Sequence, residues 1–382
     1  MFYSLGSYFL LRALKNKFFL ILAVITFSLG TYASHTMRFL TPVTLLGYLI
    51  FFQKANLKIL IQAAIVAFFT QVPNLYLAST KSFWVKSNFF AGEDLFGIIG
   101  NIISQYLTYL SPKELFFISS DINLQHTTSE LSYFYPWLLV PFLIGIFFLI
   151  QNRQKINTKL IMLLLLTSVV PASLSGEFIS VQRALPVVFA VMIIIALGID
   201  RIIIFLKPKI WIPIFALLII YSLVSLWRSY FILFPYERAE AWNYGYDKLS
   251  EFIKKNPNKN FIVDNSRNPN IYILFLYHLK YPPQKFQQEI DPTIAKNYYK
   301  APENKEFIEF ANVQIRPFSF EKDICPNNIL VGDELTVSDK QITEHNLTKV
   351  FEIKEPIQLG KILLRGYKVD SNKKCHKKVI AE

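Results

Sequence analysis

The sequence predicts a polytopic α-helical membrane protein of about eight transmembrane helices, followed by a C-terminal exterior α/β (α+β) domain. Three observations lead to this prediction. Eight apolar runs fill the first 228 residues, Lys and Arg gather in four short gaps between those runs, and shorter, more polar elements begin at residue 229. The chain is 53% apolar and 16% aromatic over 382 residues, which is more than a soluble core requires.

The apolar runs form the predicted transmembrane domain, residues 1–228. Several of them lie near the roughly 17-residue lower limit for a helix that crosses a bilayer. We expect the spans at about residues 1–14, 18–33, 39–53, 59–72, 133–151, 160–172, 183–200 and 210–228.

The basic gaps predict the orientation of these helices. Short loops rich in Lys and Arg stay in the cytoplasm of a cell whose plasma membrane the chain crosses. The 34–38 turn, the 73–132 segment, the 173–182 turn and everything after residue 229 are then exterior. Eleven of the 17 Lys and Arg residues of this domain lie in the gaps: Arg12, Lys15, Lys17, Lys54, Lys58, Arg153, Lys155, Lys159, Arg201, Lys207 and Lys209.

This alternation places Met1 outside, at the start of a helix with neither a cytoplasmic basic region nor a cleavable signal pattern. We therefore expect one or more helices to precede this point in a longer protein. A short outward N-terminus is the alternative.

The exterior segment 73–132 is too long and too polar for a plain connector. Its amphipathic stretch 94–110 is typical of a helix that lies along the membrane interface. Because long ordered loops are usually functional, this segment is the first candidate for an element that faces substrate.

The exterior domain is expected at residues 229–382. Helical patterns at 244–255 and 269–279 mix with strand patterns, which is typical of a small layered domain without a Gly-rich phosphate loop. Its Cys325 and Cys375 are the two cysteines of the chain, and whether they form a disulfide stays open. The predicted strands are 260–264, 313–316, 329–331, 350–353 and 362–365.

Net charge does not indicate a nucleic-acid partner. Residues 1–228 carry 17 basic and 7 acidic residues, a net charge of +10, and residues 229–382 carry 23 basic and 20 acidic residues, a net charge of +3. Most of the formal charge of +13 therefore lies in the transmembrane domain, where basic loops set the orientation. No HExxH, GxSxG or His and Cys cluster is present, so metalloprotease and serine-hydrolase chemistry is excluded. No cofactor is indicated, and a need for a divalent metal stays open.

Arg38 and Arg183 are the candidate anion-binding residues. Each is predicted at the outer start of a helix, where free N–H groups and the helix dipole favour a phosphate. His35 lies beside the first and Glu177 near the second. The alternative is that each guanidinium reaches lipid headgroups.

The long exterior segment adds further candidates. His126 could orient or protonate a substrate group, because histidine titrates near neutral pH, or it could simply be solvated. Asp121 lies five residues before it. Glu93 and Asp94 are candidate acids whose alternative role is to cap the amphipathic helix.

Four segments together resemble bacterial membrane glycosyltransferases of the GT-C superfamily, in the branch with protein O-mannosyltransferases and aminoarabinose transferases. They are Tyr32-Ala-Ser-His-Thr-Met-Arg-Phe-Leu-Thr-Pro42, Leu110-Ser-Pro-Lys-Glu-Leu-Phe-Phe117 with Asp121 and His126, Pro171-Ala-Ser-Leu-Ser-Gly-Glu177 with Arg183-Ala-Leu-Pro186, and Trp242-Asn-Tyr-Gly-Tyr-Asp247.

The resemblance implies a polyprenyl-phosphate-linked sugar as donor and transfer of a hexosyl or pentosyl group on the outer membrane face. Arg38 and Arg183, with His35, would hold the donor phosphate, and Asp121 or His126 would contact donor or acceptor. Members of the superfamily carry a catalytic carboxylate in the first exterior loop, and this chain has no counterpart. Glu177, Glu93 or Asp94 would have to substitute.

The sequence therefore leaves two hypotheses about the function open. The chain is either the C-terminal part of a longer glycosyltransferase, or a non-catalytic subunit or remnant that binds polyprenyl lipids. The second function calls for a separate N-terminal chain or an envelope-assembly partner, besides the membrane lipids. A transporter is disfavoured, because the predicted bundle lacks charges at mid-membrane depth and repeats in hydropathy.

Overall fold

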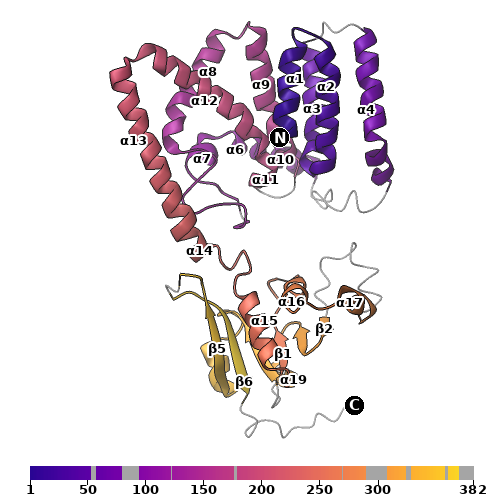
Figure 1. The fold of residues 1–382 in the computed structure, drawn as a ribbon, viewed down its shortest axis with the longest axis vertical. Coiled ribbons are helices and arrows are strands. Elements are labelled where there is room, and N and C mark those ends of the chain that lie inside the picture. The colour runs from indigo at the N-terminus through magenta and orange to yellow at the C-terminus, as the bar shows by residue number, and fades with distance from the viewer. Residues whose placement is uncertain are drawn as a thin grey trace. The chain divides into compact units, whose positions relative to one another are not determined.

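The chain folds into two compact units, Met1–Phe231 and Ile232–Glu382. The first unit is helical, and the second holds a mixed sheet (Figure 1). The sequence suggests the corresponding boundary at residue 229. The computed structural model describes residues 1–52, 57–79, 94–121, 123–175, 179–268, 270–289, 308–323, 328–357 and 360–369.

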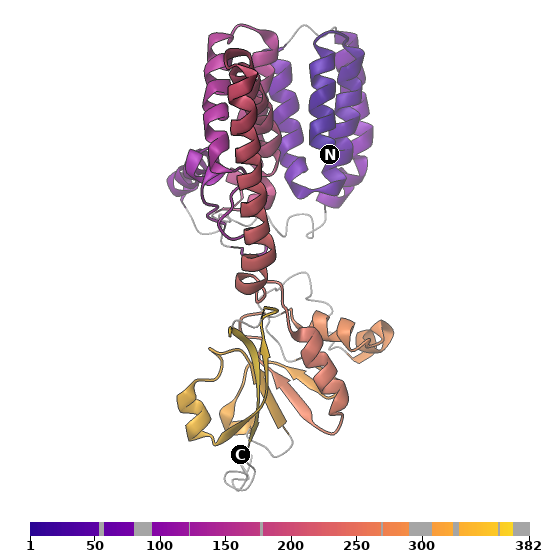
Figure 2. The same cartoon turned by 60° about the vertical axis from the view of Figure 1, so that its left-hand side comes forward.

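Long helices that run alternately up and down build the first unit. They are α1 (Phe2–Ala13), α2 (Phe18–Ala33), α3 (His35–Phe51), α4 (Leu57–Ala78), α8 (Leu139–Gln151), α9 (Ile156–Ser168), α12 (Pro186–Phe205) and α13 (Pro208–Trp227). Both views show α1 to α4 side by side (Figures 1 and 2). α2 packs against α1, α3 and α4, whereas α12 packs against α8 and α9, and contacts between α3 and α9 join the two groups.

Four helices in the described part of the chain are long and apolar enough to cross a membrane. They lie at Leu57–Ala78, Ile156–Ser173, Pro186–Phe205 and Pro208–Glu237, whereas Phe18–Ala33 and Pro136–Gln151 are apolar but shorter. The 12 residues of α1 extend only about 18 Å, against a hydrocarbon core of roughly 30 Å. The fold is that of a helical membrane protein with a sheet domain, and eight spans stay a prediction.

Glycines bring α8 and α12 into close contact. A methyl group added at Gly198 would collide with the backbone carbonyl of Pro141, and one added at Gly145 would collide with the backbone of Ile194. Small residues of this kind let helices pack where lipid gives no hydrophobic driving force for association.

Apolar side chains cover the outward faces of α4 and α13. In α4 only Ala63 and Asn74 are buried, and α13, which is described throughout, buries no residue. The Nε1 of Trp137 donates to Ser222 Oγ of α13 at 2.9 Å, and the Trp137 ring lies edge-on to Phe215. Apolar surface of this extent indicates contact with lipid or another protein.

The segment predicted at residues 73–132 starts later than the sequence indicates. α4 continues through Pro73 to Ala78, so the expected loop start at residue 73 was wrong. The polar residues Gln71 and Asn74 do not end the helix, because they hydrogen bond with Thr31 of α2. The described part of the segment then contains α6 (Leu95–Tyr109) and α7 (Pro112–Phe116), and η1 (Pro136–Leu138) leads into α8.

The second unit contains a six-stranded sheet of order β2-β3-β1-β4-β6-β5. Its strands are β1 (Asn260–Val263), β2 (Ile308–Phe310), β3 (Val313–Ile315), β4 (Asn328–Gly332), β5 (Leu347–Lys354) and β6 (Ile362–Val369). β1 is parallel to both β3 and β4, and the other pairings are antiparallel. All five predicted strands form, and β2 is an additional one.

Alternating side chains of β1 explain why both faces of the sheet are covered. Phe261 and Val263 pack into one core with α15 (Tyr246–Lys255) and α16 (Tyr272–His278), while Ile262 joins a smaller core on the other face. The remaining described helices of this unit are α14 (Phe234–Glu237), α17 (Pro283–Glu289), α19 (Phe320–Asp323) and α20 (Asp339–Glu344).

Candidate functional site

The alternation of the helices sorts the polar residues of the first unit between its two ends. The turns from α1 to α2, α8 to α9 and α12 to α13 share one end, and they carry basic residues such as Lys15, Lys155 and Lys207. At the other end, α9 leads into α10 (Val170–Ser173) and α11 (Val181–Ala184). α3 also begins there, since it contacts α10. This second end collects the candidate site residues.

The first turn of α3 pairs two of the predicted residues. Arg38 Nη1 lies 3.0 Å from His35 Nδ1, and Arg38 Nε donates to the carbonyl of Thr31 at 3.3 Å. Ser34 caps α3 without a side-chain hydrogen bond, so its side chain occupies none of the first N–H groups of the helix. A guanidinium therefore lies beside a helix start that can accept an anion.

A buried amide lies behind this pair and was missed by sequence reasoning. Asn74 Nδ2 donates to Thr31 Oγ1 at 2.8 Å and to Gln71 Oε1 at 2.9 Å. Asn74 Oδ1 is buried and has no hydrogen-bond partner among the described residues. The signal was available, because polar residues three apart in an apolar run indicate an inward-facing polar patch.

Asp121 is the centre of a second group. The carboxylate is buried, with Oδ1 accepting from the Asn123 amide at 2.8 Å and Oδ2 accepting from the Val181 amide at 2.9 Å. His126 Nδ1 lies 3.3 Å from the same Oδ2, and its side chain is 17% exposed. The structure thus brings together Asp121 and His126, two residues that the sequence singled out.

The same group fixes the segment that carries Arg183. The amide of Ser180 donates to Tyr109 Oη at 2.7 Å, next to the Val181 amide that Asp121 holds. Arg183 lies in the four-residue helix α11, and α12 starts only at Pro186. Because these two amides are already bonded, an anion here would depend on the Arg183 side chain more than on a helix end.

Glu114 is a second buried carboxylate that the sequence did not suggest as a site residue. Its side chain accepts from the Ser120 amide at 2.8 Å and from the Ser120 hydroxyl, which closes the segment after α7. The Ser111-x-x-Glu114 spacing indicates a helix start, and the Ser111 hydroxyl does accept from the Glu114 amide.

The hydroxyl of Tyr133 lies near both carboxylates. It interacts electrostatically with Asp121 and Glu114. Its Oη is buried without a hydrogen-bond partner in the part of the chain that the structure describes. Tyr133 is therefore a buried phenol beside two buried acids.

The remaining residues that the sequence singled out are either a helix cap or outside the described part of the chain. Asp94 caps α6 by accepting from the Gly97 amide at 2.9 Å, which is the alternative role considered for it. Glu93, Glu177, Cys325 and Cys375 lie outside the described residues. Within the described ranges, no three His, Cys, Asp or Glu side chains are placed to hold a metal ion.

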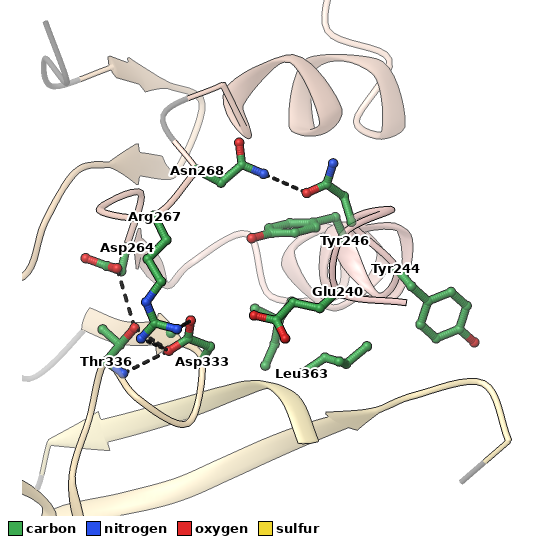
Figure 3. A pocket seen from close by; sticks show the side chains of 12 residues that line it. Glu240, Tyr244, Tyr246, Asp264, Arg267, Asn268, Asp333, Thr336 and Leu363 are labelled. Carbon is green, nitrogen blue, oxygen red and sulfur yellow. Dashed lines mark hydrogen bonds and ion pairs between the residues drawn. The ribbon is translucent and has the colours of Figure 1, made fainter. Parts of the chain in front are cut away.

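The second unit has a cavity of about 80 Å³ (Figure 3). Asp264, which follows β1, and Asp333, which follows β4, lie on one side of it. Asn243 and Tyr246 lie on another side, and none of the predicted site residues lines it.

Comparison with known proteins gave no relative: no family model, no curated protein and no solved structure matches this chain.

Proposed function

We propose that the helical unit binds a polyprenyl-phosphate-linked sugar and that the protein transfers the sugar on the outer face of the plasma membrane. In this proposal eight helices cross the membrane and the basic end faces the cytoplasm. The acceptor is a lipid, a glycan or a protein. The observation that supports this most is the buried Asp121, which contacts His126 and holds the backbone two residues before Arg183.

Arg38 and Arg183 are the proposed phosphate ligands. Both belong to segments that begin at the same end of the bundle, and Arg38 lies within the first turn of a long helix. Negative charge grows on the carrier phosphate as the sugar leaves, and fixed guanidinium groups stabilise that charge. His126 is the proposed group that orients or exchanges a proton with donor or acceptor.

One observation favours a second, non-catalytic function. Both buried carboxylates described at this end, Asp121 and Glu114, already accept backbone N–H groups. A general base needs a free lone pair for the proton that it removes. A subunit that binds polyprenyl lipid for a partner would need no such base.

The test measures binding and turnover separately. Purified protein in lipid vesicles is titrated with undecaprenyl phosphate, and transfer from a labelled undecaprenyl-phosphate sugar is followed in parallel. Arg38→Ala and Arg183→Ala should each weaken binding about 10-fold or more, since a hydrogen bond to a charged group contributes about 1.5–3 kcal/mol.

Arg201→Ala is the matched control, because Arg201 lies at the opposite end and packs over the Phe148 ring. Unchanged binding in both test variants would contradict the phosphate site. Saturable binding without transfer supports the non-catalytic function, and transfer by the chain alone excludes it.

A further inference from the structure

The cavity of the second unit lies at a reversal of strand order. The chain builds β3 on one side of β1 and then returns to place β4 on the other side, with all three strands parallel. Asp264 and Asp333 directly follow β1 and β4 at this point. Crevices beside the carboxyl ends of strands at such a reversal are where open α/β sheets bind ligands.

One wall of the cavity is a fixed polar surface. Arg267 forms a two-pronged ion pair with Asp333, with Nη1–Oδ2 at 2.6 Å and Nη2–Oδ1 at 2.9 Å. Thr336 Oγ1 donates to Asp333 Oδ1 at 2.8 Å and lies 3.4 Å from Asp264 Oδ2. This network holds both carboxylates in place before any ligand arrives, which lowers the entropy cost of binding.

The facing wall comes from the turn that precedes α15. Asn243 has a left-handed backbone with φ of 57°, and its Oδ1 accepts from Asn268 Nδ2 at 2.6 Å. The hydroxyl of Tyr246 points toward Asp264 and Arg267 (Figure 3) and hydrogen bonds with no described residue. Burial, together with the nearby carboxylates, raises the pKa of Tyr246, so the hydroxyl stays neutral and able to donate.

The lining determines the class of ligand. Arg267, paired with Asp333, is the only Lys or Arg among the described lining residues, against the three carboxylates of Glu240, Asp264 and Asp333. A phosphate or nucleotide would be repelled. Tyrosine rings and the buried Leu363 offer apolar surface, whereas carboxylates and amides accept and donate hydrogen bonds. An apolar face edged with hydroxyl groups is the property of a sugar ring.

We propose that this cavity binds one uncharged sugar unit of a glycan. The ring lies against Tyr246 and Leu363, and its hydroxyl groups bond to Asp264, Asn268 and Tyr246. The side chains of Glu240 and Arg267 at the rim are 55% and 44% exposed, so the rest of the glycan continues into solvent. The site goes beyond the proposed transfer, because it lies in the second unit and needs no lipid carrier.

The test uses the full chain in a detergent without a sugar headgroup. Saturation-transfer NMR titrations with methyl α-D-glucopyranoside, methyl α-D-mannopyranoside and methyl α-D-galactopyranoside should give saturable millimolar binding for at least one of them. The 6-phosphate of the sugar whose methyl glycoside binds should bind at least 10-fold more weakly than that glycoside. Absence of saturable binding by all three glycosides, or equal binding of the phosphate, would overturn the proposal.

Variants locate the binding. Tyr246→Phe and Asp264→Asn should each weaken glycoside binding at least fivefold, while Tyr277→Phe, at a residue that is 76% exposed and does not line the cavity, should not. Hydrogen-exchange protection of β1 confirms that each variant is folded. Undiminished binding in both test variants would refute the site. Arg38→Ala and Arg183→Ala should leave glycoside binding intact, so failure of the transfer proposal stays distinguishable.

Discussion

Asp121 joins two separate stretches of chain, residues 121–126 and the start of α11, through one carboxylate. Its oxygens accept from Asn123 and Val181 and contact His126. The sequence could single out Asp121 and His126 as polar residues of a long exterior segment. It could not show that Asp121 also holds the Val181 amide, because that amide lies 60 residues away. Glu114 was missed for the same reason, since its burial depends on how the segment folds back.

We predict that Asp121→Ala loosens α11. The amide of Val181 loses its acceptor, and an unsatisfied buried donor costs about 1–3 kcal/mol. Hydrogen exchange of peptides covering residues 179–184 should speed up correspondingly. The control is Asp94→Ala, which removes the cap of α6 and should affect exchange only there. Unchanged exchange at α11 in Asp121→Ala would contradict the role assigned to Asp121.

Tyr246 should make the second unit sensitive to alkali. Its pKa is raised above the ordinary value of 10.0 by burial, and by the charges of Asp333, Asp264 and Glu240. The folded state therefore favours the neutral phenol. Its contribution to stability is complete below about pH 10 and is lost as the pH rises through the raised folded pKa.

In Tyr246→Phe, stability should fall less than in the unmodified protein between about pH 9 and pH 11. Hydrogen-exchange protection of β1 at both pH values measures the difference, and Tyr277→Phe serves as the control. An equal fall in Tyr246→Phe and the unmodified protein would show that Tyr246 ionises as freely in the folded state as in the unfolded chain.

At the scale of elements, we predict that a larger side chain at the contact between α8 and α12 lowers the stability of the first unit. Gly198→Ala places a methyl group against the Pro141 carbonyl, and overpacking of a well-packed core costs about 1–3 kcal/mol. Its thermal unfolding midpoint in detergent should fall by several degrees. Gly100→Ala in α6 is the matched control, since nothing lies within 4 Å of its added methyl group. Equal midpoints for the two variants would refute close packing at Gly198.

The positions of most elements follow from the sequence because they depend on local patterns. Long apolar runs mark the helices of the first unit, and short continuous apolar runs mark β1 and β4, which are buried on both faces of the sheet. β2 was missed because its three residues at the edge of the sheet are too few to show alternation. The end of α4 was misjudged because Gln71 and Asn74 are satisfied by another helix. Strand order was beyond prediction, since it depends on contacts between distant segments.

For the whole molecule, the proposed orientation predicts which residues face the exterior. In a background with both cysteines replaced by serine, Lys340→Cys should react with a membrane-impermeant maleimide in intact cells, because that side chain is 82% exposed in the second unit. Lys155→Cys, in the turn between α8 and α9, should react only after permeabilisation. The reverse pattern would invert the proposed topology.

The helix that precedes the second unit buries none of its residues. Besides its chain connection to α12, it is joined to the rest of its unit through Trp137 and through the ion pair of Arg228 with Glu130 just beyond its end. Little of the buried core of the first unit therefore depends on α13. In the proposed topology, however, α13 carries the chain across the membrane, so a version of the protein without this helix would leave the second unit on the opposite side.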